Sequence, residues 1–218
     1  MACLTEVNLD LTKAEVKYAL LEKAKTLDKG IKLVMAASKH TNQNKINKRG
    51  GLMTLVRGNW SGRVKKSRSN QIGRWMYVVL QGKGARTIMI ITLYRVCEQK
   101  HQQGNCTIYL QQEHDLRTNN RKVIDPREAI LADLTTFIQQ ETTKKCDVLI
   151  MGDCNDDISK SKRIKQFMEE NNLINAISTK HKQPLPATYD RGRKCIDIIC
   201  MSKNISCNAI QLWVSTFL

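Results

Sequence analysis

Apolar residues recur along the chain with two different periods, which predict helices and strands in irregular alternation. Three segments carry apolar residues at helical spacing: residues 12–28, residues from 125 onwards, and residues 159–172. In the first segment, Thr12 and Glu15 predict a capping box, in which each side chain bonds the other residue's backbone amide. In the second, Pro126 takes the first helical position, where a backbone N–H is not needed.

Short apolar runs predict the strands. They read IKLVMAA, LMTLVRG, RWMYVVLQ, TIMIITLYRV and CDVLIMGD, and two shorter strands are expected near residues 187–189 and 195–201. The glycines at 82 and 84 predict a hairpin turn between the third and fourth runs. Residues 98–124 are polar and poorly periodic, which predicts a long surface excursion. Strands outnumber helices, so a layered α/β sandwich in one domain over residues 1–218 fits best.

The charge is high and unevenly spread. The chain has 36 Lys and Arg against 20 Asp and Glu, a formal net charge of +16. From Lys29 to Cys97 there are fifteen basic residues and no acidic residue. Such a stretch is often only a solvated face, but an imbalance sustained across several strands favours a polyanionic partner, with nucleic acid the commonest.

Nothing in the sequence resembles a membrane span or an export signal. No run approaches the roughly 18 apolar residues of a transmembrane helix. The N-terminal stretch carries acids at Glu6 and Asp10, unlike a signal peptide. Eight cysteines form no CxxC pair and mostly stand in apolar runs, where a thiol behaves as a small hydrophobe. We therefore expect an intracellular protein with reduced cysteines and no membrane partner.

The sharpest candidate for chemistry is the sequence Gly152-Asp153-Cys154-Asn155, directly after an apolar strand. Side chains alternate along a strand, so Asp153 and Asn155 project from the same side. A carboxylate there can accept a proton from a nucleophile, and an amide can donate to an anionic oxygen. The alternative is an ordinary turn, because Gly, Asp and Asn all favour turns.

Three further residues are candidates. Glu6 follows a short apolar start, where a lone Glu is usually solvated. Tyr94 ends an apolar run, where a core aromatic is the simpler interpretation. Asp197 lies inside the apolar run CIDIICM, and burying a carboxylate without a partner is costly. A functional role would explain that placement.

Taken in chain order, these residues resemble the endonuclease/exonuclease/phosphatase family. The matching motifs run from Leu4 to Met201: LTE at 4–6, GG at 50–51, LY at 93–94, GDCN at 152–155, TY at 188–189 and IDII at 196–199. The resemblance implies a DNase I-like sandwich, with two packed mixed sheets flanked by helices. The phrases TEVNLD, GRWMY and YRVC are most similar to the endonuclease-like domains found beside reverse transcriptases in non-LTR retrotransposons.

The resemblance also implies roles for these residues. Glu6 matches the family's ligand for one Mg²⁺ or Mn²⁺, an ion that binds few protein oxygens and keeps several waters. Asp153 matches the residue that activates the attacking water, and Asn155 and Tyr94 match the groups that bind the scissile phosphate. Asp197 matches the aspartate that orients a catalytic histidine. The implied partner is nucleic acid, most specifically DNA.

Two features of the family pattern are not matched. The family ends on a strand reading Ser-Asp-His, whereas none of the four histidines here, at 40, 101, 114 and 181, follows a Ser-Asp pair. The family also carries an Asn or Asp on a strand before its glutamate. We therefore expect the fold to lack its first and last strands, and the pKa of Asp197 to be raised.

The sequence predicts Mg²⁺-dependent hydrolysis of DNA phosphodiesters by a retroelement-type domain, impaired by the missing motifs. Such a domain would act in the nucleus. Two alternatives stay open: a basic nucleic-acid-binding remnant of the same fold without turnover, and a phosphatase or RNA exonuclease of the family.

Overall fold

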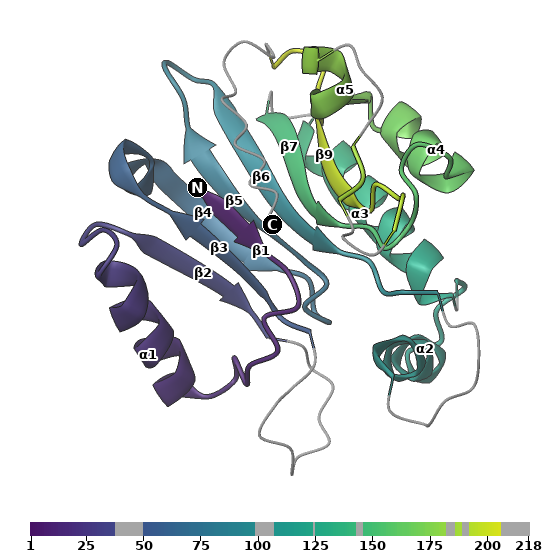
Figure 1. Cartoon of the computed structure of the whole chain (residues 1–218), viewed down its shortest axis with the longest axis horizontal. Coiled ribbons are helices and arrows are strands. Elements are labelled where there is room, and N and C mark those ends of the chain that lie inside the picture. The colour runs from purple at the N-terminus through teal and green to yellow at the C-terminus, as the bar shows by residue number, and fades with distance from the viewer. Residues whose placement is uncertain are drawn as a thin grey trace.

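Two β-sheets pack face to face between helices in the computed structural model (Figure 1). The structure describes residues 1–37, 50–98, 107–123, 125–142, 146–181, 186–188 and 192–205. The smaller sheet, sheet A, has three strands in the order β1 (Ala2–Leu4), β3 (Leu52–Val56) and β2 (Lys32–Ala36). Both of its strand pairs are antiparallel.

The larger sheet, sheet B, has six strands. Their order is β4 (Val64–Ser69), β5 (Trp75–Gln81), β6 (Thr87–Tyr94), β7 (Cys146–Asp153), β9 (Asp197–Ser202) and β8 (Leu173–Asn175). The pair β6–β7 is parallel, and the other pairs are antiparallel. A parallel pair needs a long crossover, and the helices between β6 and β7 provide it.

Helices flank both sheets. Helix α1 (Ala14–Lys25) packs on β2, and a 3₁₀ turn (Gly58–Arg63) precedes β4. On the opposite side, α3 (Pro126–Thr142) packs on β7, and α4 (Lys162–Glu170) packs beside it (Figure 1). Helix α2 (Ile108–Thr118) contacts α3, and the short α5 (Ala176–His181) packs on β8 and β9.

The core follows the alternation of side chains along the strands of sheet B. On β5, Trp75 and Tyr77 point toward the helices and pack with tilted rings against Phe137 of α3. Met76 and Val78, which alternate with them, point toward sheet A. The two sheets are also joined by a buried hydrogen bond of 2.6 Å between the hydroxyls of Thr54 and Thr92.

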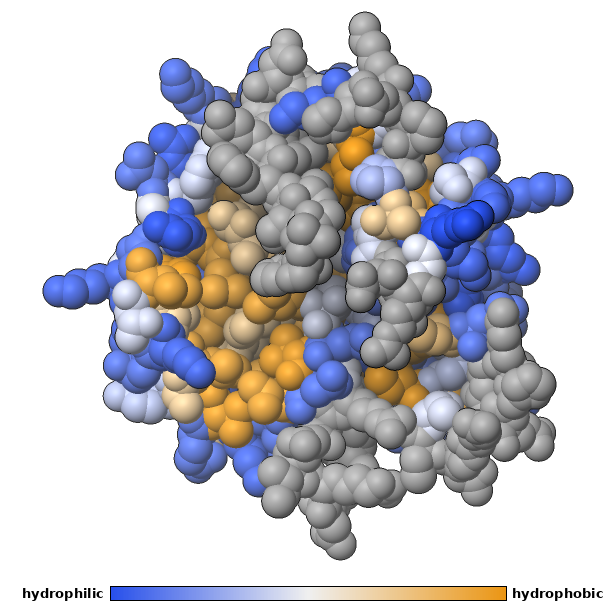
Figure 2. Space-filling model, in the orientation of Figure 1, coloured by the Kyte–Doolittle hydropathy of each residue, from blue (hydrophilic) through white to orange (hydrophobic). Residues whose placement is uncertain are grey.

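Sheet A covers only part of the inner face of sheet B. Strand β1 packs over β7, so β9 and β8 extend beyond it. Apolar side chains such as Ile174 and Ile199 are therefore only partly buried. On sheet A itself, Leu4 remains 41% exposed. Figure 2 shows apolar side chains at the surface over sheet A, surrounded by hydrophilic ones.

The sandwich of two sheets flanked by helices is confirmed, as are the hairpin at residues 82–86, the start of α3 at Pro126 and the buried face of α4. The capping box is wrong. Helix α1 begins at Ala14 with Lys13 as its N-cap, and Thr12 donates its amide and hydroxyl to Asp10 instead. Asp10 accepts from the Thr12 amide that Glu15 would bind in a capping box.

Other differences concern polar segments. Residues 98–124 contain α2, and the basic sequence VKKSRS forms the edge strand β4. No strand forms at 187–188, the described part of that predicted strand, and the hydroxyl of Thr188 there accepts from the amides of Ile196 and Asp197. In the part of the chain that the structure describes, no helix has the length and hydropathy to cross a membrane.

Gly152 allows β6 and β7 to approach closely, and we expect Gly152→Ala to destabilise the chain strongly. A Cβ at this position would lie 1.8 Å from the carbonyl oxygen of Leu93. Because both atoms belong to paired strands, the clash cannot be relieved by a rotamer change, and a cost of about 3 kcal/mol or more is expected in urea unfolding.

Gly62→Ala is the matched control, because nothing lies within 4 Å of a Cβ there. Equal stabilities of the two variants would contradict the close approach at Gly152.

Candidate active site

Three of the predicted site residues lie side by side on neighbouring strands of sheet B. Tyr94 ends β6 and pairs in register with Asp153, which ends β7. Asp153 pairs in turn with Asp197, which begins β9. Alternation places all three on the face that looks toward sheet A, because their neighbours Leu93 and Ile198 point into the helix-side core.

Glu6 reaches this group from the other sheet. It lies in the loop after β1, with a positive φ of 50° that is strained for a residue with a side chain. The glycine pair holds this loop: Gly51 and Gly50 accept at 3.2 and 2.8 Å from the amides of Val7 and Asn8. The Tyr94 hydroxyl then donates to Glu6 Oε1 at 2.5 Å.

Asn155 holds the Asp153 carboxylate at both oxygens. Its backbone amide donates to Asp153 Oδ1 at 2.7 Å, and its side-chain amide donates to Oδ2 at 3.1 Å. The second side-chain N–H of Asn155 donates to the carbonyl of Arg95 at 2.9 Å, and the Cys97 thiol donates to its Oδ1 at 2.9 Å. Asn155 therefore orients the aspartate in this arrangement.

The carboxylates at the site repel one another. Burial raises the pKa of Asp153 to about 7, with further contributions from the charges of Asp197 and Glu6. Burial, and next the hydrogen bond to Glu6, raise the pKa of Tyr94, so its phenol stays protonated and can donate.

A buried arginine lies behind the tyrosine. Arg74 is 0% exposed, and its guanidinium carbon lies 5.6 Å from the centre of the Tyr94 ring. Burial lowers the pKa of Arg74 to about 10, which still leaves it charged at neutral pH. Gln112 of α2 accepts from this guanidinium when its amide oxygen faces the arginine.

Asp197 is exposed at the start of β9, which differs from the burial expected of a carboxylate in an apolar run. The strand begins at Asp197 itself, so the residue lies at the edge of the apolar segment. The protein around its carboxyl group nevertheless raises its pKa, as expected, while a hydrogen bond to Thr188 opposes the shift.

Several residues of the site were not found from the sequence. Arg74, which stands in the motif GRWMY, and Gln112, which stands in the polar stretch 98–124, were not predicted to be buried, because buried polar residues look like surface residues in a sequence. Asn8 could have been found: its side chain accepts from the amide of Gly50 at 2.8 Å, and Asn is one of the few residues that tolerates its φ of 56°. Cys97 stood only three residues after the tyrosine.

The donors present suit a hard divalent cation. Glu6 and Asp153 offer carboxylate oxygens from two sheets, and the charge of Glu6 adds to the effect of burial in raising the pKa of Asp153. Among the described residues no group of three or more His, Cys, Asp or Glu side chains is arranged to hold a metal. Mg²⁺ needs only one or two carboxylates when waters and a substrate phosphate complete its shell.

The sequence matches no protein-family model and no curated protein. Solved structures do match, over nearly all of the chain. The human Nocturnin catalytic domain with bound sulfate is 16% identical with a TM-score of 0.58, over 92% of this chain and 68% of that one. The 3′ phosphatase NExo from Neisseria, bound to a product DNA hairpin, is 15% identical with a TM-score of 0.56, over 92% and 75%.

A third match carries the family's own description. An endonuclease/exonuclease/phosphatase family protein from Leptotrichia buccalis is 13% identical with a TM-score of 0.50, over 94% of this chain and 75% of that one. The chain has the endonuclease/exonuclease/phosphatase fold. The resemblance read from the sequence is confirmed at the level of this fold, while the likeness to retrotransposon domains and the roles of single residues remain predictions.

Asp153 makes the metal-free endonuclease/exonuclease/phosphatase fold sensitive to pH. Its pKa of about 7 exceeds the roughly 3.9 of an unfolded aspartate, so the folded state binds more protons between these values. The free energy of unfolding is therefore expected to fall as the pH rises from about 4 to about 7. Asp153→Asn removes this contribution, and urea unfolding with a chelator present measures it.

Asp147→Asn, at the opposite end of β7, is the control and should keep the wild-type pH dependence. Identical slopes for wild type and Asp153→Asn would contradict the assignment.

Proposed function

We propose that this chain hydrolyses phosphodiester bonds of nucleic acid with the help of a divalent metal ion. The observation that carries the proposal is the convergence of Glu6, Tyr94, Asp153 and Asn155 at one end of the two sheets. A carboxylate held by two amide donors, next to a second carboxylate from the other sheet, supplies a proton acceptor beside an oxygen ligand for a cation.

Asp153 acts as the general base in this proposal. A pKa of about 7 suits a base that takes a proton from water near neutral pH. The water oxygen attacks phosphorus, the proton passes to Asp153, and the bond from phosphorus to the leaving oxygen breaks. The products are a phosphate monoester and a free hydroxyl, whose proton comes from solvent.

Glu6 and Tyr94 act as a pair. Because the phenol donates to Oε1 of Glu6, it orients that carboxylate. Glu6 would hold the ion, which when bound would neutralise charge on the phosphate oxygens, while Asp153 takes the proton from water. Binding of a phosphate to Tyr94 or Asn155 would require each to exchange one of its present acceptors for a phosphate oxygen.

DNA is the partner within this proposal. The NExo structure contains a DNA hairpin, and the basic segment of the present chain includes an exposed edge strand. The exposed strand β4 carries Lys65 and Arg68, and its register with β5 and β6 places Ser69 at the end of the sheet where Tyr94 lies. The predicted retroelement origin makes the nucleus its place of action.

We expect Glu6→Gln to abolish Mg²⁺-dependent nicking of supercoiled DNA by the full chain. The substitution keeps the size of the side chain and removes the anionic ligand, so a loss of about 10²-fold or more in rate is expected. Gel assays over a range of Mg²⁺ concentrations measure it.

Glu22→Gln on the exposed α1 is the matched control and should nick at the wild-type rate. Nicking that survives in Glu6→Gln would place the activity elsewhere. A wild-type chain that binds DNA and never cuts it would favour the non-catalytic alternative.

Binding of DNA should weaken steeply with salt, at a log–log slope of about −0.9 for each phosphate contact. Arg68→Ala should make the slope shallower by about one such unit, because its side chain is exposed on β4. Fluorescence anisotropy at several salt concentrations measures this.

Lys83→Ala is the control, because Lys83 lies in the β5–β6 turn at the far end of the sheet. Equal slopes for both variants would mean that β4 does not contact the phosphate backbone.

A further inference from the structure

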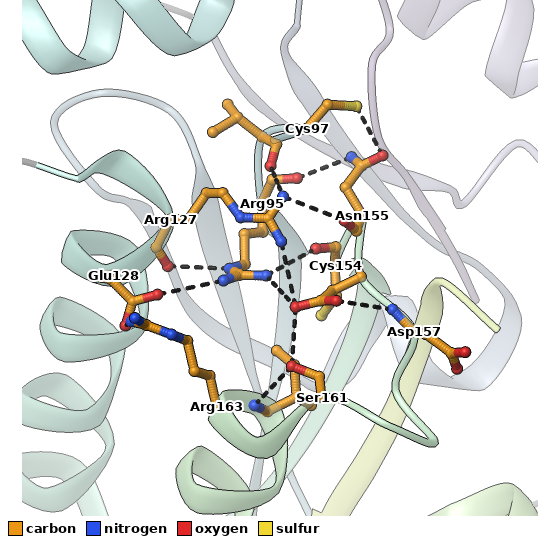
Figure 3. A network of polar contacts seen from close by, with 12 residues as sticks. Arg95, Cys97, Arg127, Glu128, Cys154, Asn155, Asp157, Ser161 and Arg163 are labelled. Carbon is orange, nitrogen blue, oxygen red and sulfur yellow. Dashed lines mark hydrogen bonds and ion pairs between the residues drawn. The ribbon is translucent and has the colours of Figure 1, made fainter. Parts of the chain in front are cut away.

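Two buried arginines bind one carboxylate next to the candidate active site (Figure 3). Asp156 Oδ2 lies 3.1 Å from Nη1 of Arg95 and 3.2 Å from Nη2 of Arg127. The hydroxyl of Ser161, which caps α4, donates to the same oxygen at 2.9 Å. Burial alone would raise the pKa of Asp156, but these hydrogen bonds and charges lower it on balance, so the carboxylate stays ionised.

The two guanidinium groups also bind backbone carbonyls from separate elements. Arg95, which follows β6, donates to the carbonyl of Arg127 at 3.0 Å and to that of Cys154 at 3.4 Å. Arg127, in the first turn of α3, donates to the carbonyls of Val96 and Asn155 at 3.2 and 3.3 Å. The ends of β6 and β7 and the starts of α3 and α4 are thereby tied together.

The network formed by Arg95, Arg127 and Asp156 contacts the predicted catalytic residues through Asn155. The carbonyl of Arg95 accepts from the side-chain amide of Asn155, which also binds Asp153. The carbonyl of Asn155 accepts from Arg127, and its φ of 47° lies in the left-handed region, which asparagine tolerates better than most residues. Asn155 is thus fixed from both its backbone and its side chain, by the side chain of Arg127 and the carbonyl of Arg95.

Stability alone does not account for this arrangement. Arg95 is 1% exposed and Arg127 is 8% exposed, and removing two cations from water is costly even when they are paired. Replacing such a network by apolar residues is often neutral or stabilising. What apolar residues cannot supply is a set of directional bonds to the carbonyls of residues 96, 154 and 155.

We infer that Asp156, clamped between Arg95 and Arg127, is a positioning residue that holds Asn155, and through it the Asp153 carboxylate, in the orientation needed for catalysis. The inference rests on the proposed hydrolysis. None of the three need touch substrate, and each acts through Asn155.

Two variants of the full chain test the network. Asp156→Asn keeps the shape of the side chain and removes its charge, and Arg127→Lys keeps the charge and removes the planar fork that spans three acceptors. We expect both to lower kcat for Mg²⁺-dependent DNA hydrolysis by about 10- to 100-fold, because small displacements of a catalytic group are costly. KM should change by less than about threefold, since the substrate-binding surface is intact.

Asp133→Asn is the matched control, because Asp133 pairs with Arg121 at the surface of α3 and should leave both constants unchanged. A rise in KM with kcat unchanged would mean that the network binds substrate, and would overturn the inference. So would a kcat within about twofold of wild type in both variants.

A second measurement does not depend on activity. The backbone amide of Asn155 donates to Asp153, so its hydrogen exchange followed by NMR reports whether the loop is held. We expect exchange to be about tenfold faster or more in both variants, while the amide of Val78 in β5 is unchanged. Unchanged exchange at Asn155 would overturn the inference.

The two proposals fail in different ways. A wild-type chain without hydrolytic activity would contradict the proposed function. The exchange of the Asn155 amide would then decide by itself whether the network positions the loop.

Discussion

The alternation of side chains along paired strands is the constraint on which this structure depends. On β6, β7 and β9, every second side chain packs against the helices, and the side chains between them face sheet A. At one end of these strands, the positions that face sheet A hold Tyr94, Asp153 and Asp197, which pair in register. A shift of one residue in β7 would bury Asp153 among the core residues of the helix side.

The second sheet completes the site with a loop instead of a strand. Glu6 and Asn8 both have positive φ, and the bonds to Gly50 and Gly51 hold them there. Functional sites are often built in this way: a rigid sheet fixes some of the side chains, and a strained loop brings another side chain into contact with them. The Tyr94 hydroxyl closes the arrangement by joining Glu6 of the loop to sheet B.

The sequence predicted those parts that obey a local rule. Strand periodicity located β5, β6, β7 and β9, and Asp153 was placed at the end of a strand. Asn155 lies beyond β7 with a φ of 47°, so a turn and not strand alternation brings it to Asp153. The rest depended on distant partners. Strand β4 is polar on both faces, α2 has a buried Gln112, and the partner of Arg95 stands 61 residues away at Asp156. No local pattern distinguishes a buried arginine from the many exposed ones on a chain of net charge +16.

The placement of the buried arginines explains how acidic groups stay unneutralised on so basic a chain. Alternation turns Arg95 away from Tyr94 and toward α3, where carboxylates and backbone carbonyls take up its donors. Arg74 is enclosed behind the Tyr94 ring. The Arg95 guanidinium binds Asp156, Glu128 and two backbone carbonyls, and burial is the main reason that the pKa of Asp153 is raised. Under the proposed function, this arrangement leaves the Glu6 carboxylate to bind the cation and Asp153 to accept a proton, while the exposed lysines and arginines of β4 contact the phosphate backbone.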